Sequence, residues 1–268
     1  MPEGDTIFRA ARALQKAMGG KVITAFRSEF PKVNRIDEDE PFKGREMTLV
    51  QARGKHLLMH LSGGLILRTH MRMAGSWHIY RHGEKWQRSQ FRERICIENA
   101  DFLAVAFDVN EAELIKEEVI ERSIVSKLGP DLLGEAFDEA EVLGLMRKQP
   151  DAPICDVVLD QRVMAGAGNV YKSELLFLAK VHPLTAVRDI IDAKLQEIIA
   201  SSREHLVNNV THASGARITT GRADPNARTW VYGRAAEPCR ECGAPIASAS
   251  VGRHVRRTYW CPRCQKRS

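Results

Sequence analysis

Hydrophobic and polar positions follow different periods in different parts of the chain. Over residues 5–18, apolar side chains recur every three or four positions, which predicts an amphipathic helix with Asp5 as its cap and a glycine pair after its end. From 21 to 109 the pattern alternates instead, and this period predicts a series of strands. The expected strands are 22–26, 47–52, 56–61, 65–69, 77–80, 94–98 and 102–107.

After Glu111 the helical period returns and continues through most of the second half of the chain. The expected helices are 111–119, 138–147, 153–160, 170–179 and 188–209. The predicted fold is α+β: an N-terminal β-sandwich with a leading helix, a helical domain, and a short C-terminal hairpin that contains cysteines. The expected boundaries are 1–122 for the β-sandwich, 123–130 for a linker, 131–236 for the helical domain and 237–268 for the hairpin.

Composition places the chain among ordinary globular proteins. Of its 268 residues, 44% are hydrophobic and 28% are charged, which argues against extensive disorder and against a small scaffold held together by metal or disulfides. No window approaches the ~18 apolar residues of a membrane span. The first ten residues include acids where a signal peptide needs basic and then apolar residues, so we expect a bacterial cytoplasmic protein.

Positive charge is concentrated in the last quarter of the chain. Lysine and arginine number 40 against 34 acids, but residues 205–268 alone contain 11 basic and 3 acidic residues. Such a segment is typical of a surface that binds nucleic acid or another acidic partner. The alternative is a basic segment that only keeps the protein in solution.

Four of the six cysteines form two C-x2-C pairs, Cys239 with Cys242 and Cys261 with Cys264. Two such pairs on tight turns predict a tetrahedral site for one structural Zn²⁺ between two short strands, 245–249 and 256–260. A redox pair or two disulfides are the alternatives. Arginines surround the pairs, and guanidinium groups bind phosphate in bidentate fashion. These residues are Arg234, Arg240, Arg253, Arg256, Arg257, Arg263 and Arg267.

Two loops and the N-terminus also suggest chemistry. The glycine-rich stretch 165–169 ends at Asn169, which we expect to cap the next helix beside an anion site; the alternative is a turn between packed helices.

The loop 70–75 carries apolar and cationic side chains that suit insertion into a base stack; the alternative is an ordinary loop of a β-sandwich. Removal of Met1 would expose the secondary amine of Pro2 beside Glu3, a pair that suits Schiff-base chemistry; the alternative is an ordinary processed terminus.

These motifs occur in an order that resembles the formamidopyrimidine-DNA glycosylase and endonuclease VIII family along the whole chain. The match begins at Pro2-Glu3-Gly4-Asp5 and ends with the four cysteines. The motifs between them lie at 53–57, 70–73, 128–131, 159–161, 165–171 and 231–234. The N-terminus and the stretch 219–234 resemble the endonuclease VIII branch more closely.

The resemblance implies a bifunctional DNA glycosylase and apurinic/apyrimidinic (AP) lyase of base excision repair. It implies that the enzyme flips out oxidised bases, with oxidised pyrimidines favoured, and that β,δ-elimination then cleaves the strand. In the family's pattern, Pro2 is the Schiff-base nucleophile, Glu3 the general acid and Lys55 the lysine at the damage site. Arg256 belongs to the catalytic set as well, because it contacts a phosphate that flanks the lesion.

The resemblance also implies how DNA is bound. Damaged DNA, duplex or single-stranded, is expected between the β-sandwich and a helix–two-turn–helix domain that carries the zinc finger, in a monomeric protein. Asn169 and Arg256 are implied to bind the phosphates, and Arg72 and Met73 to act as a wedge. Lys127 stands where the family often has an arginine for a phosphate.

Two features depart from the family's pattern, and two other functions are left open. The stretch 107–111 lacks the arginine and phenylalanine that fill the space of the flipped base, and Ala74 is small. A zinc-ribbon protein that binds nucleic acid without catalysis explains the basic tail but not Pro2, Glu3 or Lys55. A family member that binds damage without turnover is the other alternative. A zinc deaminase is disfavoured, because the H-x-E stretch at 82–84 lies far before the first C-x2-C pair and the two pairs supply four cysteines for one zinc site.

Overall fold

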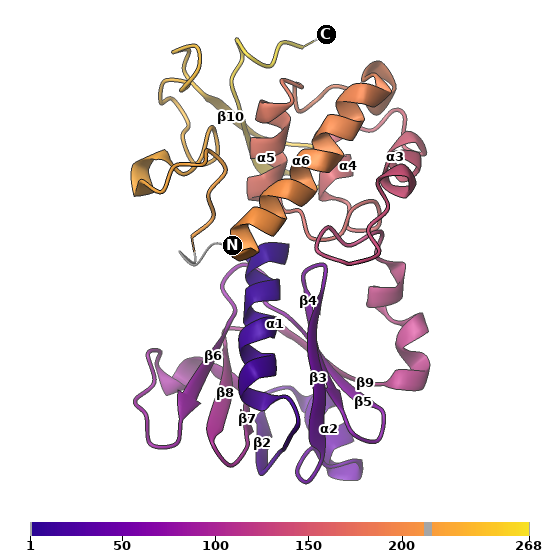
Figure 1. Cartoon of the computed structure of the whole chain (residues 1–268), viewed down its shortest axis with the longest axis vertical. Coiled ribbons are helices and arrows are strands. Elements are labelled where there is room, and N and C mark those ends of the chain that lie inside the picture. The colour runs from indigo at the N-terminus through magenta and orange to yellow at the C-terminus, as the bar shows by residue number, and fades with distance from the viewer. Residues whose placement is uncertain (1, 212–215, 268) are drawn as a thin grey trace. The chain divides into compact units, whose positions relative to one another are not determined.

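The computed structural model describes residues 2–211 and 216–267. The chain divides into two compact units, Met1–Lys127 and Leu128–Ser268, which are called unit 1 and unit 2 below. Figure 1 draws unit 1 in indigo to magenta and unit 2 in pink to yellow. Each unit encloses a hydrophobic core of its own, so each provides a separate framework for the side chains it carries.

Unit 1 is a sandwich of two antiparallel sheets (Figure 1), with strand orders β1-β3-β4-β5-β9 and β2-β7-β8-β6. Its strands are β1 (Lys21–Val22), β2 (Ala25–Ser28), β3 (Glu46–Arg53), β4 (His56–Leu61), β5 (Leu65–His70), β6 (Ser76–Arg81), β7 (Glu93–Glu98), β8 (Phe102–Phe107) and β9 (Glu111–Lys116). Leu57 and Met59 from the first sheet share one core with Ile95 and Ile97 from the second. One face of each sheet therefore lines this common core, and the predicted β-sandwich is confirmed.

The leading helix, α1 (Gly4–Met18), packs on the sandwich core through Ile7, Leu14 and Met18. This is the apolar face that the sequence pattern predicts. The predicted cap is wrong, because Glu3 occupies the N-cap position and Asp5 lies inside the first turn. Asp5 still stabilises α1, because a carboxylate in the first turn interacts favourably with the positive end of the helix dipole.

Three segments of unit 1 differ from the predicted elements. The predicted strand 22–26 is two strands, β1 and β2, which belong to different sheets. Residues 111–119 are not a helix: strand β9 pairs with β5, with Glu111 opposite His70, and a 3₁₀ helix, Glu117–Arg122, follows. The sequence of β9 suits both periods, and pairing with an open sheet edge decides between them. Helix α2 (Pro31–Asp39) was not predicted; it begins with a proline in its first turn, where the missing N–H costs nothing.

Unit 2 contains the helices α3 (Glu139–Arg147), α4 (Ile154–Leu159), α5 (Asn169–Leu178) and α6 (Asp192–Thr211). Short 3₁₀ helices lie at Gln90–Arg92 and Ile124–Lys127 in unit 1 and at Val187–Asp189 and Pro225–Ala227 in unit 2. The helices pack around Val142, Ile154, Leu175 and Ile198. Three predicted helices are confirmed to within about two residues. The fourth begins later than predicted, because residues 187–189 form a separate 3₁₀ turn.

A β-hairpin follows the helices, formed by β10 (Ala247–Val251) and β11 (Arg256–Trp260). Val251 pairs with Arg256 across the turn, and Gly252 adopts a φ of 76°, a left-handed conformation that favours glycine. Strand β10 lies two residues later than the predicted 245–249. The four-cysteine hairpin completes the predicted α+β fold, which is confirmed.

Candidate functional site

Pro2 and Glu3 lie at the start of α1. The backbone carbonyl of Glu3 accepts the N–H groups of Thr6 at 2.9 Å and Ile7 at 3.1 Å, so the first helical turn fixes this residue. The Glu3 side chain is fully buried and Pro2 is half-buried. Met1 lies outside the described residues. Removal of Met1 would make the Pro2 nitrogen an α-amino group, so the expected nucleophile and the expected proton source occupy neighbouring positions.

Lys55 lies in the tight turn between β3 and β4. Arg53 and His56 form the last pair of the two strands, and Gly54 takes a φ of 57° so that the chain can reverse. This geometry holds Lys55 at the end of the sheet, half-buried.

Directly after Lys55, His56 belongs to a polar cluster with Arg68, His70 and Glu113, which no motif in the sequence indicates. Arg68 Nη1 lies 3.1 Å from His56 Nδ1, while Arg68 Nε and Nη2 donate to Glu113 Oε2 at 3.0 and 2.9 Å. His56 and His70 contact edge to face, with ring centroids 4.8 Å apart. These residues come together only through strand register, in which His56 faces His70, so one sequence offered no signal for them.

Burial and positive neighbours lower the pKa of both histidines. Desolvation is the largest cause for His56, followed by His70 and Arg68, and together they lower its pKa to about 3. Desolvation and then Arg72 lower the pKa of His70 to about 4. Both imidazoles are therefore neutral near pH 7, and the cluster presents hydrogen-bonding groups with fixed tautomers rather than extra positive charge.

The loop 71–75 projects Arg72 and Met73 from the end of β5. The backbone N–H of Arg72 donates to His70 Nδ1 at 3.0 Å, and its guanidinium forms an ion pair with Glu111, with Nε 2.6 Å from Oε1. Arg72 adopts a φ of 50°, an uncommon conformation for a residue other than glycine. Met73 is 57% exposed. The two predicted wedge residues therefore lie on an exposed loop that His70 and Glu111 hold in place.

The stretch 107–111 has a structural role in unit 1. Phe107 and Val109 are buried, and Asp108 pairs with Arg88 at 2.9 Å and Arg92 at 2.6 Å. Glu111 is the partner of Arg72. These residues brace the sheet ends and the loop 71–75, so the stretch offers no exposed large side chain among the described residues to replace a flipped base.

Asn169 begins α5 in unit 2, and the predicted N-cap role is wrong because Gly168 occupies that position. Gln161 shapes the preceding loop: its Oε1 accepts the N–H of Gly166 at 3.0 Å and its Nε2 donates to the carbonyl of Ala167 at 2.9 Å. The Asn169 side chain is buried, and its Nδ2 donates to the carbonyl of Arg257 at 2.8 Å. The start of α5 is thus tied to the residue next to Arg256.

The other predicted phosphate contacts are exposed. Arg256 is the first residue of β11 and Lys127 is the last residue of the 3₁₀ helix Ile124–Lys127. Among the predicted site residues, Pro2, Glu3, Lys55, Arg72 and Met73 belong to unit 1, as does Lys127 at its end. Asn169 and Arg256 belong to unit 2, where they lie in one region through the contact of Asn169 with Arg257.

The four cysteines Cys239, Cys242, Cys261 and Cys264 form a metal site at the base of the hairpin. Their sulfur atoms all lie within 4.8 Å of one another, with Cys239 3.9 Å from Cys264 and Cys242 3.4 Å from Cys261. Four thiolates at Zn–S distances of ~2.3 Å are expected to be about 3.8 Å apart, so the site fits Zn²⁺. This site holds one structural zinc. Cys96 and Cys155 lie elsewhere and are buried, and burial raises their thiol pKa values to about 12 and about 11.

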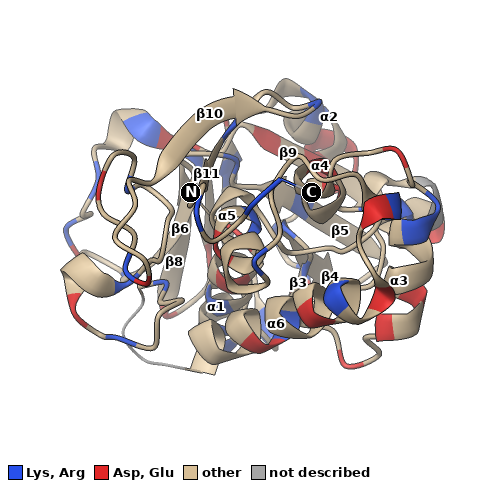
Figure 2. Ribbon diagram, turned by 90° about the horizontal axis from the view of Figure 1, so that it is seen from above, with Lys and Arg blue, Asp and Glu red and all other residues tan. Residues whose placement is uncertain are grey.

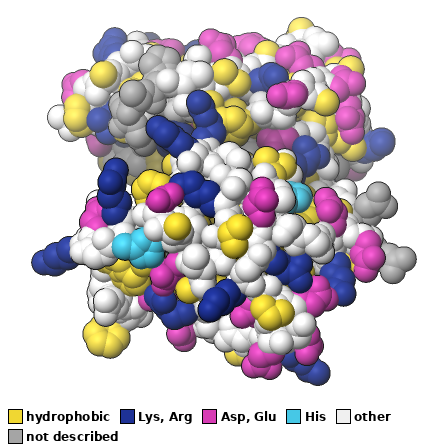
Figure 3. Space-filling view, turned by 60° about the horizontal axis from the view of Figure 1, so that its bottom comes forward, with side chains coloured by type: hydrophobic (Ala, Val, Ile, Leu, Met, Phe, Trp, Pro, Cys, Tyr) yellow, Lys and Arg dark blue, Asp and Glu magenta, His cyan; other side chains and the backbone are white. Residues whose placement is uncertain are grey.

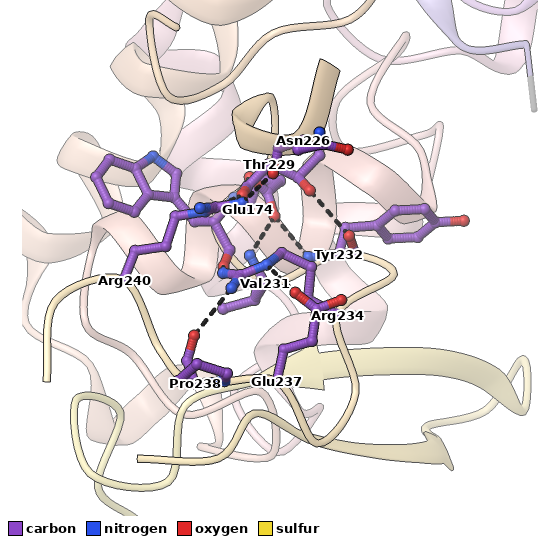
Figure 4. Close-up of polar contacts among 10 residues, drawn as sticks. Glu174, Asn226, Thr229, Val231, Tyr232, Arg234, Glu237, Pro238 and Arg240 are labelled. Atoms are coloured by element: carbon purple, nitrogen blue, oxygen red, sulfur yellow. Dashed lines mark hydrogen bonds and ion pairs between the residues drawn. The ribbon is translucent and has the colours of Figure 1, made fainter. Parts of the chain in front are cut away.

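Two of the arginines near the cysteines hold the protein together rather than face a ligand (Figure 4). Arg234 is only 8% exposed, and its Nη1 and Nη2 donate to the carbonyls of Trp230 at 2.6 Å and Pro238 at 2.9 Å. Arg240, between the first two cysteines, donates Nε to the carbonyl of Thr229 at 3.0 Å. Backbone carbonyls therefore occupy these two guanidinium groups.

Glu174 of α5 binds the backbone of residues 230–232, which precede the zinc finger (Figure 4). Its fully buried carboxylate accepts the backbone N–H groups of Trp230, Val231 and Tyr232 at 2.7, 2.9 and 2.8 Å, and the hydroxyl of Thr219 donates to Oε2. The segment 229–232 is therefore held between α5 and the zinc finger.

The remaining basic residues of the zinc finger are exposed and lie in the hairpin turn, on β11 and in the chain after β11. They are Arg253, Arg256, Arg257, Arg263, Lys266 and Arg267. Figure 2 colours the basic residues blue on the ribbon. By contrast, basic and acidic side chains are interspersed across the face that Figure 3 draws. None of the helices in the described part of the chain is long and apolar enough to cross a membrane.

The structure combines a sandwich with a leading helix, a helical unit and a basic four-cysteine zinc finger. Three family models match consecutive parts of the chain: the formamidopyrimidine-DNA glycosylase N-terminal domain at 1–110, the formamidopyrimidine-DNA glycosylase H2TH domain at 128–220, and the zinc finger found in FPG and IleRS at 236–267. The chain belongs to the formamidopyrimidine-DNA glycosylase and endonuclease VIII family.

Similar proteins span the whole chain. The probable endonuclease 8 2 of Streptomyces coelicolor is 37% identical over 275 residues, which cover 99% of this chain and 94% of that protein. The DNA-(apurinic or apyrimidinic site) lyase Nei2 of Mycolicibacterium smegmatis is 36% identical over the full length of both. A crystal structure of Lactococcus lactis Fpg with DNA that contains an oxidized pyrimidine has a TM-score of 0.84 at 25% identity, and covers 99% of this chain and 100% of that one.

Proposed function

We propose that this DNA glycosylase and AP lyase of base excision repair removes oxidised bases, pyrimidines above all, through a Schiff base on Pro2. Glu3 is the general acid and Lys55 acts at the damaged nucleotide. The observation that carries the proposal is the placement of Glu3, whose carboxyl group is buried and whose backbone is fixed by the first turn of α1, directly after Pro2. A buried carboxyl group in a fixed position suits proton transfer to a sugar oxygen.

The proposed reaction begins with attack of the Pro2 nitrogen on C1′ of the damaged nucleotide. The new N–C1′ bond replaces the bond to the base, which leaves with the electron pair and takes up the proton that the Pro2 nitrogen loses. Glu3 then gives its proton to the sugar oxygen, so the ring opens and the nitrogen and C1′ form an iminium. The resulting iminium acidifies C2′, so loss of a C2′ proton expels the 3′ phosphate. Loss of a C4′ proton then expels the 5′ phosphate. The reacting groups all come from the protein and the DNA, and zinc only holds the hairpin.

The proposed DNA contacts place cationic and amide groups against the phosphates that flank the lesion. Arg256 and Lys127 are exposed cations, and Asn169 lies beside the residue that follows Arg256. Arg72 and Met73 fill the stack when the damaged nucleotide is flipped out, a step that costs a few kcal/mol. Support for this wedge comes from the exposure of Met73 and from the contacts that hold Arg72.

We also propose four structural regions: a catalytic β-sandwich over 1–122, a linker over 123–130, a helix–two-turn–helix domain over 131–236 and the zinc finger over 237–268. The change of unit after Lys127 supports the linker, and the four-cysteine cluster supports the last region. A monomer in the bacterial cytoplasm, bound to the nucleoid through its DNA, remains our prediction for the working state.

The direct test is a panel of oligonucleotides that carry thymine glycol, dihydrouracil, 8-oxoguanine or an abasic site, each as duplex and as single strand. We expect base release and strand cleavage at the oxidised pyrimidines, with 3′-phosphate and 5′-phosphate ends after δ-elimination. Cleavage at the abasic site without release of any base would reduce the function to a lyase. Binding without either reaction would favour the zinc-ribbon alternative.

A further inference from the structure

The turn of the zinc-finger hairpin is bound to a buried carboxylate on α4. Asp156 is 7% exposed, and its Oδ2 accepts the backbone N–H of Arg253 at 2.7 Å. A Cβ atom added to Gly252 would lie 2.2 Å from Asp156 Oδ1. The residue before Arg253 must therefore be glycine for two reasons, because the carboxylate lies against it and because its φ is 76°.

Two further contacts hold the hairpin on the other side of Arg256. Asn169 Nδ2 donates to the carbonyl of Arg257 at 2.8 Å, and the buried Lys172 donates Nζ to Thr258 Oγ1 at 2.6 Å. The side chains of α4 and α5 thus contact residues 253, 257 and 258, which bracket Arg256 in the sequence. The Arg256 side chain itself is exposed.

The zinc site fixes a different part of the hairpin. Its nearest ligand to Arg256 in the sequence is Cys261, which follows the end of β11, so the metal holds the base of the hairpin. A two-stranded hairpin is marginally stable by itself and is free to twist at its tip. The orientation of the turn therefore depends on a second support, and Asp156 is the side chain that contacts it.

We propose that Asp156 is a positioning residue for DNA binding, which fixes the turn of the zinc finger so that Arg256 meets its phosphate. The inference rests on the proposed function of Arg256. It assigns the turn of the hairpin to Asp156 of α4, strand β11 to α5 and the base to zinc, so the support of the turn can be removed without removing the zinc. An acidic side chain beside the proposed DNA-binding surface would weaken binding if it acted through charge alone, so a positioning role and a purely electrostatic role predict opposite effects of its removal.

The experiment compares Asp156→Ala, Asp156→Asn, Gly252→Ala and Arg256→Ala in the full-length, zinc-loaded protein. Affinity for duplex DNA that contains a tetrahydrofuran abasic analogue is measured by fluorescence anisotropy at two salt concentrations. Zinc content is measured for every variant, and hydrogen exchange reports on the Arg253 amide in the free protein. Asp156→Asn is the matched control, because it removes the charge but keeps an oxygen that accepts the Arg253 N–H.

We expect Asp156→Ala and Gly252→Ala to bind about fivefold to tenfold more weakly with unchanged zinc content, because each releases the turn by a different route. Asp156→Asn should stay within about twofold of the wild type. The Arg253 amide should exchange faster in Asp156→Ala but not in Asp156→Asn.

A purely electrostatic role predicts the opposite, since removal of an acid near DNA strengthens binding. Affinity of Asp156→Ala equal to or tighter than wild type would overturn the proposal, as would equal weakening in Asp156→Asn. Arg256→Ala distinguishes failure of the proposed function from failure of the inference about Asp156. If Arg256→Ala leaves binding unchanged, the proposed role of Arg256 is wrong and the inference is wrong with it. If only Arg256→Ala weakens binding, the proposed function stands and Asp156 has no positioning role.

Discussion

Asn169 and Arg257 are joined by a hydrogen bond of 2.8 Å from the side-chain amide of the first to the backbone carbonyl of the second. The contact ties the first residue of α5 to the residue that follows Arg256. Two proposed phosphate contacts, 87 positions apart in the sequence, therefore share one local framework. A change at either position is expected to disturb the other.

This coupling gives the first prediction. Arg256→Ala should weaken DNA binding and lower the slope of log K against log salt by about one, because it removes one cation from a phosphate, whereas Asn169→Ala should weaken binding and leave the slope nearly unchanged, because an amide carries no charge. The double variant should lose less affinity than the sum of the two, with a coupling on the order of 1 kcal/mol. Anisotropy titrations of a double-mutant cycle measure this, and strict additivity would show that the two residues act independently.

Glu3→Gln should suppress base removal about a hundredfold or more while strand cleavage at a preformed abasic site falls much less. The acid is needed to open the sugar and release the base, whereas an abasic aldehyde is already reactive. Single-turnover rates on a dihydrouracil duplex and on an abasic duplex give the comparison. Equal loss on both substrates would mean that Glu3 only maintains the start of α1.

Glu174→Gln should lower the free energy of unfolding of unit 2 by about 2 kcal/mol, because an amide places a donor among the N–H groups and hydroxyl that the carboxylate now accepts. Calorimetry with zinc present checks this. Glu197→Gln is the control: this residue is on α6 with a partly exposed ion pair to Lys194, and should change stability by less than about 0.5 kcal/mol. Similar effects in both variants would contradict the role of Glu174.

The lowered pKa values of His56 and His70 predict acid sensitivity in unit 1. Because the folded pKa values of about 3 and about 4 lie below the unfolded value, the unfolded chain binds more protons as pH falls below about 6.5. The stabilising contribution of the two neutral histidines is fully present above about pH 6.5. It is lost as pH falls from there toward the folded pKa values of about 4 and about 3. Urea unfolding at pH 7 and pH 5 should show a loss on the order of 2 kcal/mol per histidine that His56→Gln reduces. An unchanged loss in this variant would assign the sensitivity to other groups.

The sequence predicted those features that depend on local pattern. Alternation located the strands of the sandwich, and the spacing of Cys239, Cys242, Cys261 and Cys264 located the metal site, because both patterns reflect geometry within a few residues. The sequence predicts a helix over 111–119, but residues 111–116 suit the period of a strand equally well and form β9. Only the free edge of β5, which no local window contains, selects the strand.

The candidate site shows the same limit. Arg234 and Arg240 are basic residues in a basic segment, and nothing local distinguishes them from Arg256. Their interior role depends on the carbonyls of Thr229 and Trp230, which the fold brings to them. Asp156 and Glu174 were also missed, because a single buried acid has no signature until its backbone partners are known.

The central claim is that the nitrogen of Pro2 attacks the sugar, and borohydride trapping with peptide mapping tests it most directly. The protein is incubated with an abasic duplex and reduced, the complex is digested, and the cross-linked peptide is identified by mass spectrometry beside a Pro2→Gly variant. The account predicts a peptide that begins at Pro2, without Met1, joined to DNA through its terminal nitrogen, and at least about a hundredfold slower trapping in Pro2→Gly with binding retained. An active preparation that retains Met1, or a cross-link at Lys55 with Pro2 unmodified, would contradict it.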